Sequence, residues 1–293
     1  MTAIGVVGAG NMGSAIVHRL ALGADVLLYD RDTERANQLA SERVVIAGSL
    51  EEFDACEVVV LSLPSPQISA TVIGALADVI PAGSVVIETS TVLPSAVIEC
   101  ERVLQSRGIH LVDAAILSGV ELMRAGTTTL LVGGDSDAVN AASATLELLT
   151  PRRVLLGVLG AGMAAKVANN AVSHAVMVVL IEAITTAKLS GVPPEVMCEL
   201  LAAPDGGLMR PLTHRVAERI MHADYDGGMT TEAARKDSAL ALALAQEHHV
   251  PLFAIQAAHT VYEVAMDGGL GRDDYAAIAR LWEGWTGVDF AES

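Results

Sequence analysis

The sequence predicts two domains of different class: an α/β domain built on a parallel sheet, then an all-α helical domain, with a long interdomain helix linking them. Over the first half of the chain, short β-branched runs alternate with helical segments, which is the pattern of a parallel sheet covered by helices. Past Gly162 the strand signals stop and helical periodicity continues. We therefore place the domains at residues 1–160 and 161–293.

The first strand is predicted at Ala3–Val7, a short apolar run without polar alternation. A GxGxxG turn follows at once and opens a helix through Leu20. A second apolar strand, Val26–Tyr29, ends in an acidic residue twenty positions past the central glycine. Strand, glycine turn, helix and acid together predict a Rossmann-type NAD(P) site, in which the backbone approaches the pyrophosphate at a helix N-terminus. The residues of the turn assigned to this site are Gly8, Gly10, Asn11, Met12 and Gly13.

The acid at the end of the second strand, Asp30, bears on the choice of dinucleotide. Its carboxylate would accept hydrogen bonds from the ribose hydroxyls and repel a 2′-phosphate, so it favours NAD over NADP. The next residue, Arg31, could instead bind a 2′-phosphate or simply lie on a surface turn. We assign both residues to the cofactor site.

Further strands and helices follow at the spacing of βαβ units. Because ligands of an open parallel sheet bind beyond the carboxyl ends of its strands, Leu63, Pro64 and the hydroxyl run Thr89–Thr91 are predicted to line the cofactor crevice. Each hydroxyl taken alone is more often a helix cap. The predicted strands are Glu57–Pro64, Ser84–Glu88, Ile109–Asp113, Thr128–Gly134 and Val154–Leu156, and the predicted helices are Ile68–Ile80, one from Pro94, and Asp137–Leu149.

The second half opens with a helix predicted to run from Gly162 to about Leu189, roughly 40 Å long at 1.5 Å per residue. It is apolar nearly all round, so we expect it to be buried. Its most hydrophobic stretch, Ala175–Ile181, is judged too short to cross a bilayer. Later helices are predicted at Pro194–Leu201, Pro211–Met221, Thr230–His248, Pro251–Asp267 and Asp273–Trp282.

Two polar residues of the long helix, Lys166 and Asn170, are four positions apart and therefore project from one face. Such a pair can hold one small polar molecule, and a buried lysine would have a lowered pKa. The alternative is an ordinary solvated lysine. On a later helix, Lys236 and Asp237 are adjacent and are expected to point in different directions, not to form a simple ion pair.

Composition restricts the partners and the compartment. Lys and Arg number 18 against 35 Asp and Glu, so the formal net charge is −17, which disfavours nucleic acid and anionic membrane. The three cysteines are widely spaced and have no CxxC pair, so neither a disulfide framework nor a zinc site is indicated. The apolar start has no basic segment before it, and we expect a cytoplasmic protein with a small-molecule substrate.

Taken together, these motifs resemble the β-hydroxyacid dehydrogenase family, which includes 3-hydroxyisobutyrate dehydrogenases, and the resemblance covers nearly the whole chain. The most specific match is the run from Gly160 through Lys166 to Asn170. The other matching segments are Gly8–Gly13, Thr89–Thr91 with Pro94, Asp113–Ala114, Arg124–Thr127 and Lys236–Asp237.

The resemblance implies roles for several residues. It implies that Lys166 is the catalytic acid/base, that Asn170 binds substrate beside it, and that Thr91 lies against the nicotinamide. It also implies that Lys236 lines the closed active site on the cofactor side. Finally, it implies an all-α domain through which the chain forms a homodimer or a homotetramer.

One segment departs from the family pattern. Where the family usually has Ser-Gly-Gly for the substrate carboxylate, this chain has Leu117, Ser118 and Gly119. Ser118 could still supply a hydroxyl and Arg124 could reach an anion, but a more apolar substrate fits the segment equally well. The related imine reductases look similar here, although they generally lack a lysine at position 166.

We therefore expect an NAD(P)-dependent oxidoreductase that transfers a hydride between nicotinamide and a small 3-hydroxyacid or related hydroxy compound, with Lys166 exchanging the hydroxyl proton. An imine reductase on the same fold is the first alternative. A non-catalytic dinucleotide sensor is the second, and it would need Gly8–Gly13 and Asp30 but not Lys166.

Overall fold

The computed structural model describes residues 3–291. The chain divides into two compact units, residues 1–171 and 172–293, and each is described by itself. The division falls inside the long helix, eleven residues beyond the domain end expected at residue 160, because the first turns of that helix pack on the sheet.

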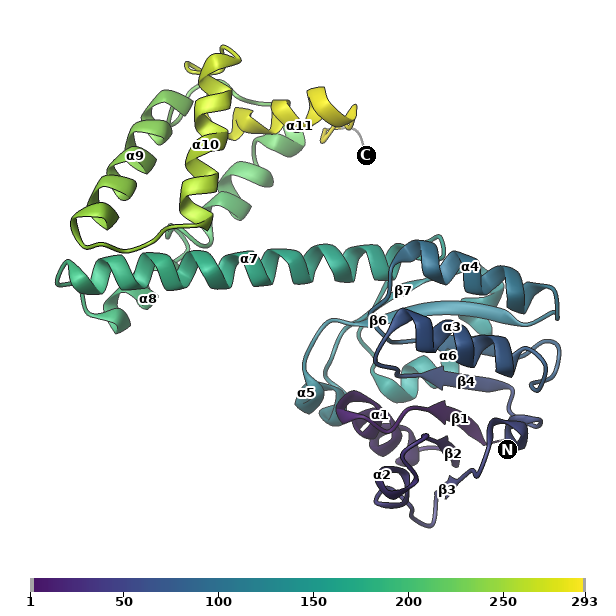
Figure 1. Ribbon diagram of the computed structural model, residues 1–293. Helices are drawn as coiled ribbons and strands as arrows, with labels where there is room; N and C mark the ends of the chain where they lie inside the picture. Colours follow the sequence, from purple (N-terminus) through teal and green to yellow (C-terminus); the bar gives the residue numbers. More distant parts are fainter. Residues whose placement is uncertain (1–2, 292–293) are drawn as a thin grey trace. The chain divides into compact units, whose positions relative to one another are not determined.

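The first unit is built on one eight-stranded sheet with the strand order β3-β2-β1-β4-β5-β6-β7-β8 (Figure 1). All neighbouring strands are parallel except β6 and β7, which are antiparallel. The chain order reverses between β1 and β4, and such a switch point is where a parallel sheet binds ligands. The strands are β1 (Ile4–Val7), β2 (Val26–Tyr29), β3 (Val44–Ile46), β4 (Val58–Leu61), β5 (Val85–Glu88), β6 (His110–Ile116), β7 (Leu130–Gly133) and β8 (Arg153–Leu155).

Helices cover both faces of this sheet, so successive strand residues enter two separate cores. Val6 and Val60 pack with helices α1 (Asn11–Ala21) and α6 (Ser136–Leu149). Val7 and Val59 pack with α3 (Pro66–Leu76) and α4 (Pro94–Gln105). Burial on both faces explains why these strands read as continuous apolar runs. The smaller elements are α2 (Thr33–Asn37), the 3-10 turn η1 (Leu50–Phe53) and α5 (Val120–Ala125).

Several predicted bounds in this unit were wrong. Strand β3 and helices α2 and α5 were missed, since three to six residues are too few to show a period. Strand β6 continues to Ile116 because residues 113–116 pair with β7. Helix α3 begins at Pro66, where the Ser65 hydroxyl accepts the Ile68 N–H, and it ends at Leu76, not at Ile80.

The second unit is helical in its described part. Helix α7 (Ala161–Leu189) enters it from the first unit and is followed by α8 (Pro194–Ala202), α9 (Thr231–Glu247), α10 (Ala254–Asp267) and α11 (Ala279–Thr286). The helix predicted at Pro211–Met221 is replaced by a π-helical turn, η2 (Pro211–Val216), and a 3-10 turn, η3 (Ile220–His222). The predicted helix at 273–282 is replaced by the 3-10 turn η4 (Tyr275–Ile278) and α11.

Buried charged groups organise this unit. The Glu182 carboxylate of α7 accepts the backbone N–H groups of Phe253, Ala254 and Ile255, and so caps the start of α10. Asp274 is fully buried and pairs with Arg215 at 3.0 Å, which draws the η2 turn onto the start of η4. These contacts link segments that are far apart in the chain, so neither could be predicted from local patterns.

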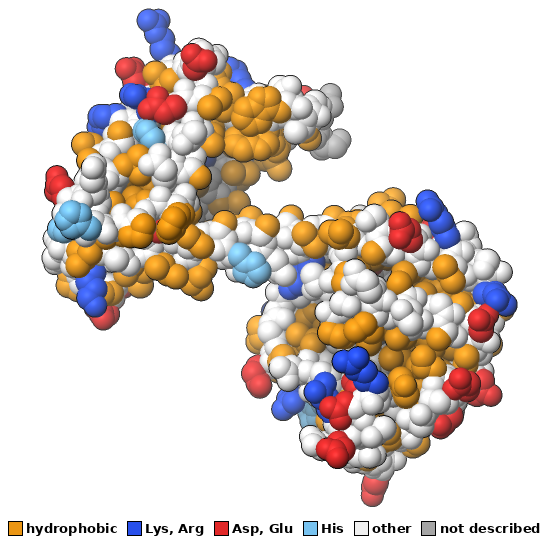
Figure 2. Space-filling view, in the orientation of Figure 1, with side chains coloured by type: hydrophobic (Ala, Val, Ile, Leu, Met, Phe, Trp, Pro, Cys, Tyr) orange, Lys and Arg blue, Asp and Glu red, His pale blue; other side chains and the backbone are white. Residues whose placement is uncertain are grey.

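The expectation that α7 is buried was wrong for this chain taken alone. Val172, Met177 and Ile181 are each more than half exposed, and Figure 2 shows hydrophobic side chains along this helix. An 18-residue window of α7 has a mean hydropathy of 1.6, so by length and composition the helix could span a membrane. The expectation from Ala175–Ile181 alone was therefore too narrow. Glu182 on this helix is engaged as the cap of α10.

Candidate active site

The glycine turn after β1 is shaped by very close backbone approaches. Gly8 has a φ of +108°, and a Cβ there would lie 2.1 Å from the Ser62 carbonyl oxygen. A Cβ on Gly13 would lie 2.1 Å from the Gly8 carbonyl oxygen, so α1 rests directly on the turn. A Cβ on Gly10, in contrast, would have no protein atom within 4 Å. The turn is therefore tight on its protein side and open where a phosphate would approach.

The open side of the turn leads into a cleft of about 460 Å³ at the carboxyl ends of β1, β2 and β4. Helix α1 starts there with no acidic residue in its first turn and no side-chain cap, so its first N–H groups are free for an anion. Asn11 and Met12, which the sequence assigns to the cofactor site, line the cleft. These features fit a dinucleotide pyrophosphate.

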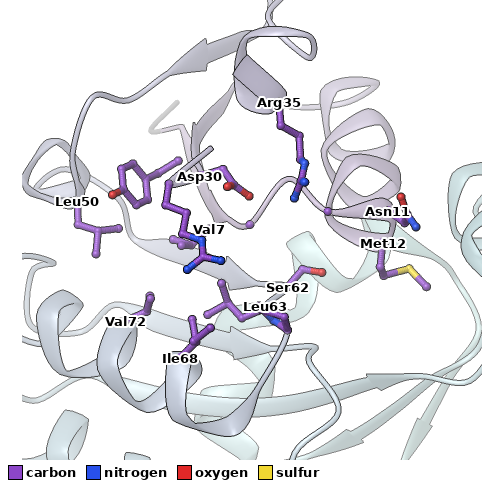
Figure 3. A pocket seen from close by; sticks show the side chains of 15 residues that line it. Val7, Asn11, Met12, Asp30, Arg35, Leu50, Ser62, Leu63, Ile68 and Val72 are labelled. Atoms are coloured by element: carbon purple, nitrogen blue, oxygen red, sulfur yellow. The ribbon is translucent and has the colours of Figure 1, made fainter. Parts of the chain in front are cut away.

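The predicted acid lies in the same cleft. Asp30 accepts the Ala9 N–H through Oδ2 at 2.6 Å and the Asp32 N–H through Oδ1 at 2.8 Å, which holds its carboxylate beside the turn. Arg31 also lines the cleft, as does Arg35 of α2, which the sequence reasoning missed. Figure 3 shows Asp30 and Arg35 on one side of the cleft, across from Ile68 and Val72. The cleft thus has one charged wall and one apolar wall.

The apolar wall comes from the end of β4 and from α3. Leu63 and Pro64, which the sequence assigns to the cofactor crevice, line it, and so do Ile68 and Val72, which the sequence did not indicate. Leu50 of η1 also lines the cleft. The flat face of an adenine base could be buried against such side chains. The spacing of Ile68 and Val72, four apart on α3, was a signal that could have found them.

The three hydroxyls after β5 differ in their use. Thr89 Oγ1 donates to the Leu61 carbonyl at 2.6 Å, and Ser90 Oγ accepts the Leu63 N–H at 2.8 Å. Both side chains are buried and join the end of β5 to the end of β4. Thr91 is exposed, so its hydroxyl is free to meet a ligand. The helix that follows, α4, has no side-chain cap, so none of the three serves as one.

A buried carboxylate fixes the start of α7. Asp113 of β6 is fully buried, and its Oδ1 accepts the Gly160 N–H at 2.7 Å while its Oδ2 accepts the Met163 N–H at 2.8 Å. A Cβ on Gly162 would lie 2.3 Å from the Leu131 carbonyl oxygen, so only glycine lets the helix come this close to the sheet. The family motifs around Asp113 and Gly160–Gly162 therefore meet at one point in the structure.

Lys166 follows this anchored turn directly. Its side chain is half-buried, and burial lowers its pKa, in the direction expected from the sequence. Within residues 3–291 it forms no salt bridge that would oppose this shift. Asn170, one helical turn later on the same face, is also half-buried. A lysine in this state can gain and lose a proton closer to neutral pH than a solvated one.

The altered segment after β6 offers few free polar groups. Leu117 is 37% exposed, and its N–H donates to the Thr129 carbonyl. The Ser118 hydroxyl is hydrogen-bonded to the hydroxyl of buried Thr128. Gly119 is exposed at the start of α5. Arg124 lines a second cavity with Gly10, Asn11, Ser14 and Arg35, on the cofactor side of the fold.

Lys236 lies on α9 in the second unit, where its side chain is 65% exposed. The expectation that it does not pair with its neighbour was wrong, because its Nζ lies 2.8 Å from Asp237 Oδ1. A lysine side chain is long enough to fold back over one residue, which backbone directions alone do not reveal. Over the described residues there is no cluster of metal-ligating side chains.

Comparisons with known proteins agree with this geometry. The family described as the NAD binding domain of 6-phosphogluconate dehydrogenase matches residues 3–160. The family described as NAD-binding of NADP-dependent 3-hydroxyisobutyrate dehydrogenase matches residues 160–282.

Full-length relatives point the same way. The 2-(hydroxymethyl)glutarate dehydrogenase of Eubacterium barkeri is 31% identical, over 97% of this chain and 96% of its own. The mitochondrial 3-hydroxyisobutyrate dehydrogenase of Mus musculus is 27% identical, over 94% and 86%. Among solved structures, an imine reductase from Pseudomonas sp. shares the fold with a TM-score of 0.85 at 21% identity, over 96% of this chain and 99% of its own.

The fold and the cleft define an NAD(P)-binding oxidoreductase with a helical second domain, as the sequence predicted. The full-length match at 31% identity and the two family matches identify the family within this class. It belongs to the β-hydroxyacid dehydrogenase family, and both relatives named above are dehydrogenases of hydroxyacids.

Proposed function

We propose that this protein catalyses reversible hydride transfer between a nicotinamide ring and the carbinol carbon of a small 3-hydroxyacid or related hydroxy compound, with Lys166 as the general acid/base. The observation that carries the proposal is the state of Lys166: half-buried, without a salt bridge among the described residues, and set on a helix turn anchored to the sheet by Asp113. The bound dinucleotide supplies or accepts the hydride.

The residues of this chain divide the remaining work. Lys166 Nζ takes the hydroxyl proton during oxidation and returns it during reduction, and its lowered pKa favours both steps near neutral pH. Asn170, on the same helix face, holds the substrate oxygen or its acid group through its amide. The free hydroxyl of Thr91 is proposed to lie against the nicotinamide end of the cofactor.

For the cofactor we propose NAD over NADP. Asp30 keeps lone pairs on both carboxylate oxygens for ribose hydroxyls, and its charge repels a 2′-phosphate. The opposing feature is the pair Arg31 and Arg35 on the same cleft, which could neutralise that phosphate. Parallel measurements of kcat/KM with NAD and NADP test the preference, and a higher value with NADP contradicts it.

The altered segment limits how the substrate carboxylate can be held. The Leu117 N–H and the Ser118 hydroxyl are both hydrogen-bonded within the protein. We therefore assign the contact with the substrate carboxylate to Gly119 and Asn170, and to the hydrogen-bonding capacity that the Ser118 hydroxyl has left. Arg124 lines the second cavity with Gly10. We therefore propose that it assists substrate binding and does not supply the main contact with the carboxylate.

An imine reductase activity is the second candidate, favoured by exposed Leu117, which offers an apolar surface where the family usually has a serine. Lys166 favours the dehydrogenase. A stopped assay of 3-hydroxyacids beside a cyclic imine, each with both dinucleotides, separates these activities. Turnover of a hydroxyacid supports the proposal, whereas turnover of the imine alone supports the alternative. Dinucleotide binding without any turnover would support a sensor.

We further propose a homodimer or homotetramer formed through the helical domain. Exposed apolar side chains lie along α7, including Val172, Met177 and Ile181, and α11 exposes Trp282 and Trp285. Surfaces of this kind are normally covered by protein. Light scattering after size-exclusion chromatography tests this, and a monomer at micromolar concentration contradicts it.

We propose a cytoplasmic location, which agrees with the free thiols of Cys56, Cys100 and Cys198, and no nucleic-acid or membrane partner. Cell fractionation tests the location. Lys236 remains a proposed cofactor contact, and a weaker dinucleotide affinity in Lys236→Ala is the expected result.

A further inference from the structure

A polar cluster lies at the end of β5, outside the dinucleotide cleft. Glu88, the last residue of β5, is 2% exposed and lines a small cavity with Ser69 of α3 and Cys100 of α4. The rest of the lining is apolar: Pro66, Ile73, Val92, Ala96, Val97 and Leu111. The cavity holds about 10 Å³, which is room for about one water molecule.

Two buried polar atoms, Glu88 Oε2 and Ser69 Oγ, face this cavity. Among residues 3–291 neither has a partner at strict hydrogen-bond geometry, but the Ser69 hydroxyl is close enough to the Glu88 carboxyl to lower its pKa as a hydrogen-bond donor does. Native proteins satisfy nearly all buried polar atoms. The Ser69 hydroxyl is therefore the polar partner of Glu88 at this cavity.

The charges around Glu88 disfavour its ionised form. The charged group that faces it from β6 is the Asp113 carboxylate, and the group that faces it from α4 is the Cys100 thiol. Neither is a cation, and Glu88 forms no salt bridge within the described part of the chain. Burial raises the pKa of Glu88 above its usual value and outweighs the hydrogen bonds from Ser90 and Ser69, and Asp113 raises it further.

The other oxygen of Glu88 leads to the dinucleotide cleft. Glu88 Oε1 accepts the Ser90 N–H at 2.8 Å, and Ser90 Oγ accepts the Leu63 N–H at 2.8 Å. Leu63 lines the apolar wall of the cleft. A chain of two hydrogen bonds thus runs from a buried carboxyl to the backbone of a cofactor-binding residue.

We propose that Glu88 is a positioning residue for dinucleotide binding: by accepting the Ser90 N–H on one side and facing Ser69 on the other, it fixes Ser90 and thereby the Leu63 wall of the cleft. Its raised pKa favours the neutral acid, whose proton on Oε2 can be donated to Ser69 Oγ. Oε1 remains free to accept from Ser90. The inference needs dinucleotide binding only and does not depend on the role of Lys166.

Binding of NADH to the full-length protein, followed by fluorescence titration, tests the positioning role. Glu88→Leu removes the acceptor for Ser90, and Ser90→Ala removes the acceptor for Leu63, so each is expected to weaken binding about tenfold. Glu88→Gln keeps an acceptor and a donor without charge and is expected to bind within about twofold of the parent. Cys100→Ala, which alters the same cavity without touching the hydrogen-bond chain, is the matched control.

The titration has two outcomes that overturn the proposal. Parental affinity in both Glu88→Leu and Ser90→Ala shows that the chain does not position the cleft. An equal loss in Glu88→Gln and Glu88→Leu shows that the charge of Glu88 is needed. If Glu88→Leu does not fold, as judged by circular dichroism, Ser90→Ala and Glu88→Gln decide the matter.

A further measurement tests the protonation state of Glu88. Since the folded-state pKa is raised, the stability contributed by Glu88 is full below the usual pKa of a glutamate and is lost as pH rises above it. The melting temperature of Glu88→Gln is therefore expected to gain on the parent between pH 5 and pH 8, and a constant difference contradicts the neutral acid.

Discussion

Replacement of Asp113 by alanine tests how far the start of α7 depends on one buried carboxylate. The change removes the acceptors of the Gly160 and Met163 N–H groups, at 2.7 and 2.8 Å, and leaves both donors buried. At about 1.5 kcal/mol for each lost bond to a charged acceptor, the free energy of unfolding of the first unit falls by about 3 kcal/mol. The corresponding drop in melting temperature is on the order of 10 °C.

The same change has a kinetic consequence, because Lys166 lies one turn after Met163. A displacement of the helix start by about 1 Å is expected to lower kcat on the order of a hundredfold. The Kd for the dinucleotide is expected to change little, since Asp113 does not line the cleft. The kcat of Asp113→Asn should lie between those of the parent and Asp113→Ala, because the asparagine amide offers one acceptor oxygen but places its own N–H donor against one of the two backbone N–H groups.

Calorimetry, steady-state kinetics and dinucleotide titration on the same preparations measure these effects. Asp135→Ala is the matched control, since Asp135 occupies the N-cap position of α6 but makes no side-chain cap bond. Parental melting temperature and kcat in Asp113→Ala would refute the reasoning. A loss of dinucleotide affinity as large as the loss of kcat would also refute it, because the effect would then not be confined to α7.

Three further predictions rest on substitutions elsewhere in the chain. Burial raises the pKa of Glu182, but its three bonds from backbone N–H groups outweigh this and lower it, so the stability it contributes is present above the usual glutamate pKa and is lost as pH falls through the folded value. Glu182→Gln should lower the free energy of unfolding by about 2 kcal/mol at pH 7, and in urea titrations it should reduce the dependence of that free energy on pH in the acid range. Gly13→Ala should disrupt the fold, as measured by circular dichroism, because its Cβ would lie 2.1 Å from a backbone oxygen. Gly10→Ala should fold, because its Cβ meets no protein atom within 4 Å, but it should bind NADH more weakly, because the Cβ occupies the side of the turn that a phosphate would approach. Asp30→Ser should shift the ratio of kcat/KM about tenfold toward NADP, and Arg35→Ala added to it should reverse that shift.

The parts of the site that local patterns could predict are those built from contiguous residues. Gly8–Gly13 is preceded by a strand and followed by a helix, and the structure has both at those positions. Asp30 was found by its distance from the glycine turn, and it lines the cleft. The change from α/β to all-α was visible because the apolar period changes there.

The parts that could not be predicted depend on contacts between distant segments. Asp113 caps a helix fifty residues later, and no feature of either segment alone shows the pairing. Arg35 lines the cleft from a five-residue helix that is too short to show a period. The π-helical turn at 211–216 places Arg215 against Asp274, so tertiary contact overrides the helical pattern there.

The exposure of α7 shows a different limit of sequence reasoning. An apolar period predicts that a helix face will be covered but not which surface covers it. In this chain taken alone, Val172, Met177 and Ile181 remain exposed, while Glu182 on the same helix is buried by capping α10. The pattern was interpreted correctly as apolar, and the inference that this chain itself buries the helix was wrong.

The central claim is that Lys166 exchanges the substrate proton, and the kcat of Lys166→Ala tests it most directly. With the best hydroxyacid from the substrate screen, kcat is expected to fall on the order of a thousandfold while the Kd for the dinucleotide stays within about twofold. Lys188→Ala, which removes an exposed lysine from the same helix, should leave kcat unchanged. Turnover in Lys166→Ala equal to that of Lys188→Ala would contradict the account.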